Sequence, residues 1–217
     1  MSISDALVLW VDAFFISPYA FSSFVALKEK KLPFELRLVP LHEKAQHAPD
    51  YRDRSLTSRV PTLAHGELQL SESSAIDEYL DESFPDPAYA PIYPRDRKAR
   101  ARVRQIQAWI RSDLMPLREE RSANTMFYER AGAPLSPEGR AAADKLLRVV
   151  DRILPEGAEH LVGVWCIADS ELSFMLHRLI LNGDPIPDRL RRYAERQWQR
   201  PTVREWVVRE RPPFAPY

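Results

Sequence analysis

Cysteine is almost absent from this chain. Cys166 is the single cysteine among 217 residues, and one thiol cannot form an internal disulfide or a cysteine-based zinc site. The sequence therefore argues against a secreted, disulfide-stapled protein, and we expect Cys166 to be a buried structural residue rather than a redox centre. The five histidines lack the spacing of metal ligands, so we expect no metal site.

An excess of charge of one sign is also absent. The 31 Lys and Arg residues balance 31 Asp and Glu residues, for a formal net charge of zero. A neutral chain has no general attraction for nucleic acid or an anionic membrane, so neither is expected as a partner. The basic stretch PRDRKARARVR (94–104) is either a nucleic-acid-binding stripe or a solvated or subunit-facing helix side. The second interpretation is favoured, because no aromatic residue interleaves with the basic ones.

Long apolar runs are missing too. No stretch approaches the roughly 18 apolar residues of a membrane-spanning helix. No basic residue precedes Lys28, and Asp12 interrupts the first apolar run, which argues against a signal peptide. We therefore expect a cytoplasmic protein with no membrane partner.

The first 85 residues have the pattern of a small mixed sheet covered by helices. A strand, a crossover helix and a second strand favour a parallel pair, and a later hairpin adds antiparallel strands. In chain order we expect a strand at 6–11, a helix at 18–31, a strand at 34–39, a short helix within 42–58, a hairpin at 62–70 and a helix at 74–84.

The remainder has only helical patterns. Prolines crowd the segment 86–96, which we interpret as a linker. The predicted domains are thus an α/β domain at 1–85 and an all-α domain at 97–217. Helical periodicity is expected at 95–121, 138–154, 169–182, 187–199 and 201–210, and a loop at 124–139.

Ser17 and Pro18 open the first helix, and two interpretations of Ser17 compete. Serine is a favoured N-cap and proline suits the first helical turn, so a capping role alone accounts for the pair. The other interpretation makes the Ser17 hydroxyl the group that does the chemistry. Periodicity by itself favours the cap.

Val60 and Pro61 stand at the entry to a strand. A residue before proline is extended, so the N–H and C=O of Val60 are free to pair with a peptide-like ligand. The sequence alone does not justify a cis bond there.

The segment LSESSAIDEYL (70–80) offers a second polar group. Ser74 and Asp77 have the spacing of a capping box, which leaves Glu72 and Ser73 unused. A carboxylate beside a hydroxyl and helix-end N–H groups suits the zwitterionic head of an amino acid. The plainer interpretation is a solvated carboxylate at a helix start.

In this order, four segments resemble the cytosolic glutathione S-transferases, in particular bacterial members with a serine-type site. The resemblance runs over nearly the whole chain, and its segments are SPYAFSSFVALKEKKLPFE (17–35), SRVPTL (58–63), LSESSAIDEYL (70–80) and GVWCIADSELSFML (163–176). It implies a thioredoxin-like α/β domain of order β-α-β-α-β-β-α that binds glutathione. It further implies an all-α domain that shapes the co-substrate pocket, and a homodimer.

The resemblance also implies roles for individual residues. Ser17 matches the family's serine at the first helix and is the expected catalytic residue. Val60 would pair through its backbone with the cysteine of glutathione, beside a cis Pro61, and Glu72 with Ser73 would hold the γ-glutamyl head. Arg59 is a weaker candidate for contact with a carboxylate.

Three residues are expected in the co-substrate pocket, namely Phe15, Trp109 and Arg111. For Trp109 the plainer interpretation is core packing, and for Arg111 it is a surface position. The alternatives are about equal from the sequence.

Three features depart from the family pattern. SLTSR (55–59) replaces a common Asn-Pro-x-Gly-Lys stretch, and Lys31 stands where a glycine usually ends the first helix. Cys166 replaces the Ser or Thr of a capping box whose Asp169 is still expected to face the helix start.

The expected function is that of a glutathione transferase, an enzyme of detoxification and oxidative stress. It would activate the glutathione thiol as a thiolate for attack on a small electrophile or an oxidised substrate such as a peroxide. Glutathione is then a co-substrate, and no other cofactor is expected. Two alternatives stay open: a glutathione-dependent peroxidase or disulfide reductase on the same fold, and a non-catalytic thioredoxin-fold interaction protein.

Overall fold

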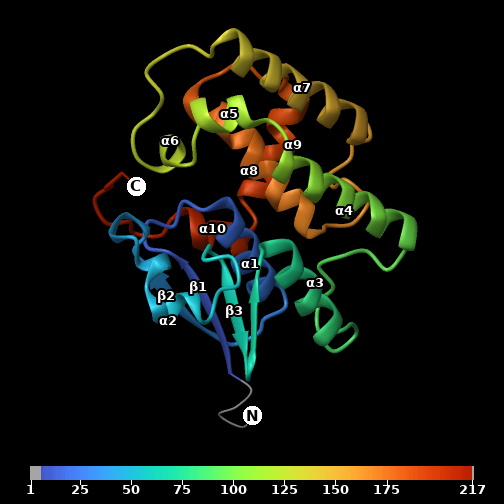
Figure 1. Cartoon of the computed structure of the whole chain (residues 1–217). Coiled ribbons are helices and arrows are strands. Elements are labelled where there is room, and N and C mark those ends of the chain that lie inside the picture. Colours follow the sequence, from blue (N-terminus) through green and yellow to red (C-terminus); the bar gives the residue numbers. More distant parts are fainter. Residues whose placement is uncertain (1–5, 217) are drawn as a thin grey trace. The chain divides into compact units, whose positions relative to one another are not determined.

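A computed structural model describes residues 6–216 of the chain. The chain forms two compact units (Figure 1). One unit extends to Ile92 and includes the segment that begins at Glu205, and the other comprises Tyr93–Arg204. The last segment therefore packs with the α/β unit, whereas the sequence predicted residues 97–217 as one helical domain. The reason is the apolar contact of Trp206, described below.

Four strands form one mixed sheet in the first unit. β1 pairs in parallel with β2 and antiparallel with β3, and β3 pairs antiparallel with β4. The order across the sheet is β2-β1-β3-β4. The predicted parallel pair and antiparallel hairpin are confirmed. The strands are β1 (Leu7–Asp12), β2 (Phe34–Val39), β3 (Thr62–His65) and β4 (Leu68–Ser71).

Two helices pack on the sheet, and an apolar cluster forms around Trp10 of β1. Helices α1 (Pro18–Glu29) and α3 (Ser73–Ser83) pack on each other and on β1 and β3. Alternation along β1 sends Trp10 away from Leu9, into a cluster with Val39, Tyr51 and Ala64. That cluster is covered by the short helices η2 (Leu41–Glu43), η3 (Ala45–His47) and α2 (Pro49–Arg52). The first unit thus has the predicted β-α-β-α-β-β-α order of a thioredoxin-like domain.

Buried polar groups join α1 to α3. Asp77, which has no exposed surface, accepts hydrogen bonds from the hydroxyls of Ser22 (2.6 Å) and Ser23 (3.1 Å). The predicted capping box of Ser74 and Asp77 is wrong, because α3 begins at Ser73 and Ser74 lies inside the helix rather than at its N-cap. The ammonium of Lys30 is buried as well, and it donates to the carbonyl of Phe84 at 2.9 Å.

The end of α1 shows how the chain manages without the family's usual glycine. Lys31 adopts φ = 54°, in the left-handed region. Its N–H donates to the carbonyl of Lys28, and that of Leu32 donates to the carbonyl of Leu27. These two bonds form a Schellman motif, so a lysine occupies the position that glycine normally takes.

The second unit is helical, which confirms the all-α prediction. Helix α8 is buried along almost its whole length. The predicted helix 95–121 breaks at Leu114, which has φ = 64°, and the predicted loop 124–139 contains a one-turn helix. The helices are α4 (Arg97–Ser112), α5 (Met115–Glu120), α6 (Asn124–Phe127), α7 (Pro137–Ile153), α8 (Ile167–Asn182) and α9 (Asp188–Trp198), while α10 (Pro201–Val207) crosses the boundary between the units.

Asp169 organises the start of α8. Its carboxylate accepts hydrogen bonds from the N–H groups of Leu161 and Cys166, both at 2.9 Å, and from the hydroxyl of Tyr193 at 2.8 Å. The prediction that Asp169 faces the helix start is confirmed. Cys166 has no exposed surface, and burial raises the pKa of its thiol. In residues 6–216 no helix has the length and apolar character needed to cross a bilayer.

His177 lies inside the helical unit as a neutral side chain. Its ring stacks on Trp198 with centroids 3.9 Å apart, and its Nδ1 lies 2.8 Å from the carbonyl oxygen of Ser173. Burial lowers the pKa of His177 to about 4, and the charge of Arg191 adds to that shift. Protonation of this ring therefore opposes folding.

We expect His177 to make the protein sensitive to acid. Its pKa falls from 6.5 in the unfolded chain to about 4 in the folded one, so its contribution is complete above pH 6.5 and is lost as the pH falls through about 4. The difference amounts to about 3 kcal/mol. Urea unfolding across this range should show a smaller loss in His177→Phe, which retains an aromatic ring beside Trp198. His47→Gln, at an exposed position, is the control. If the free energy of unfolding fell equally with pH in the unsubstituted protein, His177→Phe and His47→Gln, the assignment would be contradicted.

Candidate functional site

Three chain segments meet at one edge of the sheet. β1 ends at Asp12, which pairs with Val39 at the end of β2. Trp10 pairs with Thr62 at the start of β3, and Thr62 pairs with Ser71 at the end of β4. The turn after β1, the residues before β3 and the residues after β4 therefore leave the sheet at the same edge. These segments carry Ser17, Val60 and Glu72.

Asp12 holds the turn between β1 and α1. Its carboxylate is fully buried and accepts hydrogen bonds from the N–H groups of Ile16 (2.8 Å) and Ser17 (3.1 Å). Burial raises the pKa of Asp12, whereas these N–H groups and the charge of Arg211 oppose that rise. Asp12 thus fixes the backbone of Ser17 where α1 begins.

Ser17 is the N-cap of α1. Its Oγ accepts a hydrogen bond from the N–H of Ala20 at 3.2 Å, and the residue is half-buried. Pro18 occupies the first helical position, as predicted. Within the described chain the Ser17 hydroxyl donates to no acceptor. The cap uses an acceptor lone pair, so the hydroxyl hydrogen stays available to an anion.

The backbone of Val60 is open to a ligand. The Val60–Pro61 bond is cis, and within residues 6–216 no hydrogen bond engages the N–H or C=O of Val60. Its neighbour Arg59 is held firmly, because the Arg59 carbonyl accepts from the hydroxyl of Tyr51 (2.8 Å) and from that of Ser55 (3.1 Å). The Arg59 side chain itself is exposed.

Glu72 and Ser73 form the start of α3. Glu72 is exposed and has φ = 71°, a left-handed conformation that costs a non-glycine residue on the order of 1 kcal/mol or more. Its side chain makes no capping bond to the helix. Ser73 is buried as the first helical residue. The strained turn therefore presents the Glu72 carboxylate to solvent beside the N-terminus of an eleven-residue helix.

Phe15 is packed within its own unit. It is 7% exposed, and its ring meets Trp206 edge-on with centroids 5.4 Å apart. The guanidinium of Arg209 lies 5.0 Å from the same ring. Little of the Phe15 side chain is left for a co-substrate, and its role in that pocket stays a prediction.

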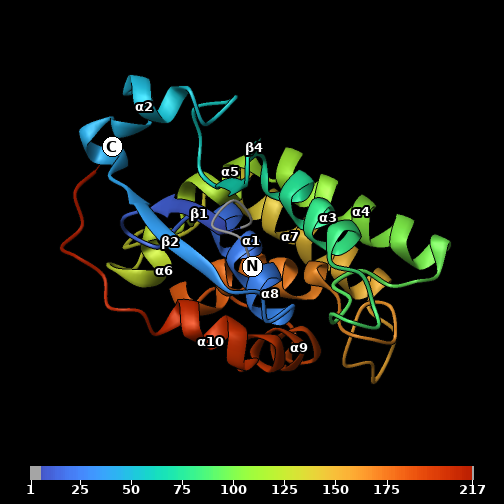
Figure 2. The same ribbon diagram turned by 90° about the horizontal axis from the view of Figure 1, so that it is seen from below.

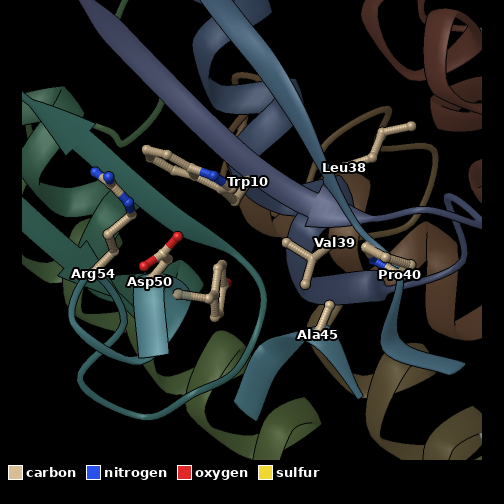
Figure 3. Close-up of a pocket in the computed structure, with 8 residues that line it drawn as sticks. Trp10, Leu38, Val39, Pro40, Ala45, Asp50 and Arg54 are labelled. Carbon is tan, nitrogen blue, oxygen red and sulfur yellow. The ribbon is translucent and has the colours of Figure 1, made fainter. Parts of the chain in front are cut away.

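A separate hollow of about 190 Å³ opens on the opposite side of the sheet from α1 (Figure 3). Arg54 points toward the indole of Trp10, with 5.7 Å between guanidinium and ring, and Asp50 lies beside it. None of the predicted site residues lines this hollow. It is therefore distinct from the sheet edge that carries Ser17.

Trp109 and Arg111 lie on α4 in the helical unit. The Trp109 indole N–H donates to Asp113 at 2.9 Å, and its ring lines a hollow of about 620 Å³ between α4 and α7. The guanidinium of Arg111 is engaged by both carboxylate oxygens of Glu171, at 3.0 Å and 2.5 Å. Arg111 is thus part of a largely buried ion pair rather than a surface residue, and the pocket role of both residues stays a prediction.

The sequence did not reveal the roles of two residues in the first unit, Asp12 and Arg211. Asp12 was noted only for interrupting an apolar run, although a carboxylate directly after a strand and before a helix start is a signal for such a turn. Arg211 lies in a proline-rich tail without periodicity, and no local pattern connects it with Phe15. Within residues 6–216 no three His, Cys, Asp or Glu side chains gather as metal ligands would.

Family models match both parts of the chain. Residues 96–210 match the C-terminal domain of glutathione S-transferase, and residues 16–83 match its N-terminal domain. Human glutathione S-transferase theta-1 is 35% identical over 140 residues, which are 61% of this chain and 55% of the human protein. Glutathione S-transferase T3 of Arabidopsis thaliana is 32% identical over 120 residues, or 55% of this chain and 20% of the plant protein. The chain thus spans less than two thirds of these relatives.

Solved structures agree with the family models. A glutathione transferase homologue from Burkholderia GL BGR1 with bound glutathione is 46% identical, with a TM-score of 0.78 over 93% of this chain and 96% of that one. A theta class glutathione S-transferase from Xanthomonas axonopodis pv. citri, with glutathione bound, has a TM-score of 0.73 over 95% of this chain and 99% of that one. At 21% identity it shows a common fold.

We expect Asp12→Asn to destabilise the protein by about 1–3 kcal/mol, because an amide group would face the N–H of Ile16 or Ser17 where an acceptor is needed. Urea unfolding of the purified variant measures this loss. Asp53→Asn, at an exposed position, removes the same charge and should change the stability by less than about 0.5 kcal/mol. Similar effects of the two substitutions would show that Asp12 does not hold the turn.

Proposed function

The chain belongs to the glutathione S-transferase family, and from that premise we propose that it is a glutathione transferase whose thiolate site lies at the sheet edge around Ser17. The observation that carries the proposal is the convergence of three open groups at this edge. They are the hydroxyl of Ser17, the unpaired backbone of Val60 and the exposed carboxylate of Glu72. The bound glutathione of the homologue from Burkholderia GL BGR1 supports this reading.

Each open group fits one part of glutathione. The extended residue Val60 would exchange backbone hydrogen bonds with the cysteine of the tripeptide, as strands do at a sheet edge. Glu72 would accept from the ammonium of the γ-glutamyl head, and Ser73 with the first N–H groups of α3 would donate to its carboxylate. Arg59, with its exposed side chain, is a further candidate for a carboxylate of the tripeptide.

Ser17 and the start of α1 would then stabilise the thiolate. A thiol of this type has a pKa of about 8.5, so only a few per cent is ionised at neutral pH. A hydroxyl donor and a helix N-terminus both favour the anion, and lowering the pKa by about two units requires about 2.7 kcal/mol. The proton passes to solvent. The sulfur lone pair forms a bond to an electrophilic carbon, and the leaving group departs with its bonding electrons.

Other properties stay predictions. A homodimer and a cytoplasmic location are typical of the family, and light scattering of the purified protein would test the first. No observation favours the peroxidase, the disulfide reductase or the non-catalytic interaction protein over the transferase.

We expect reduced glutathione to stabilise the protein. Ligand at about 100 times its dissociation constant should add about 2.7 kcal/mol to the free energy of unfolding. Thermal unfolding with and without millimolar glutathione measures this effect, and Glu72→Gln, which loses the partner of the ammonium, should weaken it. The absence of any shift in the unsubstituted protein would sink the proposal.

We expect Ser17→Ala to fold and bind glutathione but to raise the pKa of its bound thiol, because a donor to the thiolate is lost. The pH dependence of thiolate absorbance in the complex measures that pKa. Ser58→Ala, nearby at the same sheet edge but outside α1, is a matched control. An unchanged thiol pKa in Ser17→Ala would mean that the backbone N–H groups of α1, and not the Ser17 hydroxyl, stabilise the thiolate.

A further inference from the structure

We propose that Arg211, in the tail after α10, is a positioning residue that holds the turn before Ser17 and balances the charge of Asp12 beneath it. The inference rests on the proposed function, since its purpose is to favour a thiolate at Ser17. The tail is residues 208–216, and in both views it runs from α10 toward the segment after β2 (Figure 1 and Figure 2). All of the contacts involved lie within the first unit.

The guanidinium of Arg211 joins the tail to the turn. Its Nη2 donates to the carbonyl of Phe15 at 3.2 Å and to that of Trp206 at 3.1 Å. Its Nη1 donates to the carbonyls of Val207 (3.0 Å) and Arg209 (2.9 Å). Three of these carbonyls belong to the end of α10 and the residues just after it, and the fourth lies two residues before Ser17. A planar group with several donors in a fixed geometry suits such a bridge.

Neighbouring contacts hold Arg211 in place. Trp206 is fully buried against Phe15, Phe21 and Phe24, at centroid distances of 5.4, 6.1 and 5.3 Å. Further along, Phe214 packs on Phe14 with centroids 5.4 Å apart. The bridge is therefore anchored on both sides of Arg211.

Charge gives the bridge a second effect. Asp12 lies under the turn and accepts the N–H of Ser17, so its negative charge opposes an anion at the start of α1. The cation of Arg211 lowers the pKa of Asp12 against the effect of burial, which indicates that it offsets the same charge. Other charged or titratable groups also face this region. Arg209 lies over Phe15, Lys28 pairs with Glu205 at 2.6 Å, and His42 lies beside Phe14.

A simpler role for Arg211 would be to hold the tail in place by its hydrogen bonds alone. In that case any loosening of the tail should have the same effect as loss of the guanidinium. Phe214→Ala loosens the tail and leaves the charge unchanged, whereas Arg211→Gln removes the charge and shortens the bridge. Arg211→Lys keeps the charge with fewer donors. Arg204→Gln, on α10, removes a cation at a position with no side-chain partner in the described chain.

The test is the pKa of the glutathione thiol in each complex, together with the pH profile of kcat and the KM for glutathione with an activated chloronitroarene as electrophile. We expect Arg211→Gln to raise the thiol pKa by about 0.5–1 unit. From a bound-thiol pKa of about 6.5, this lowers the thiolate fraction, and with it kcat, about 1.5- to threefold at pH 7, about three- to tenfold at a pH well below that pKa, and much less at high pH. Arg211→Lys should retain most of the effect on the pKa. Phe214→Ala and Arg204→Gln should leave the thiol pKa within about 0.2 unit of the unsubstituted protein.

Three results would overturn the inference. One is an unchanged thiol pKa in Arg211→Gln, and another is an equal shift in Phe214→Ala. The third is a rise of the thiol pKa in Arg211→Lys as large as the one expected for Arg211→Gln. This third measurement also decides the question if Arg211→Gln does not fold. Thermal unfolding separates the two proposals: no glutathione shift in the unsubstituted protein removes the proposed function, whereas a normal shift with an unchanged thiol pKa removes only the role of Arg211.

Discussion

The buried carboxylate of Asp12 is the interaction on which the site depends. It stands at the end of the strand that pairs with both β2 and β3, and it accepts the N–H groups of Ile16 and Ser17. Burying a charged group is costly unless its hydrogen bonds are satisfied. Because the N–H groups of the turn satisfy this carboxylate, the turn and the start of α1 have one favourable geometry relative to the sheet.

The same device recurs in the helical unit. Asp169 accepts backbone N–H groups before α8, and Glu120 accepts the N–H of Ser136 before α7 at 2.7 Å. The hydroxyl of Ser136, which donates to Glu120 at 2.6 Å, and then its N–H lower the pKa of Glu120, while burial raises that of Asp169. In both units, then, carboxylates set where helices begin. Of these three helix starts, that of α1 alone has a serine whose hydroxyl donates to no acceptor within residues 6–216, since Ser136 donates to Glu120 and α8 starts at Cys166.

Ser17 and the N–H groups of α1 can act on one anion because α1 is held rigidly. The helix is tied to α3 through Asp77 and to the chain after α3 through Lys30. A helix N-terminus favours an anion only if its N–H groups stay directed at it. The cap and the catalyst are therefore compatible assignments for Ser17, since one uses an oxygen lone pair and the other the hydroxyl hydrogen.

The sequence by itself determined the parallel strand pair, the hairpin and the helix start at Ser17-Pro18, and it singled out the candidate residues Val60, Glu72 and Ser73, because periodicity, proline and capping chemistry act over a few neighbouring residues. It could not assign Asp77 to Ser22 and Ser23, Arg111 to Glu171, or Arg211 to Phe15. The separations are 55 and 54 residues for Asp77, 60 residues for Arg111 and 196 residues for Arg211. Only the packing of each unit decided them, since a buried charge takes the partner that the tertiary fold brings within reach.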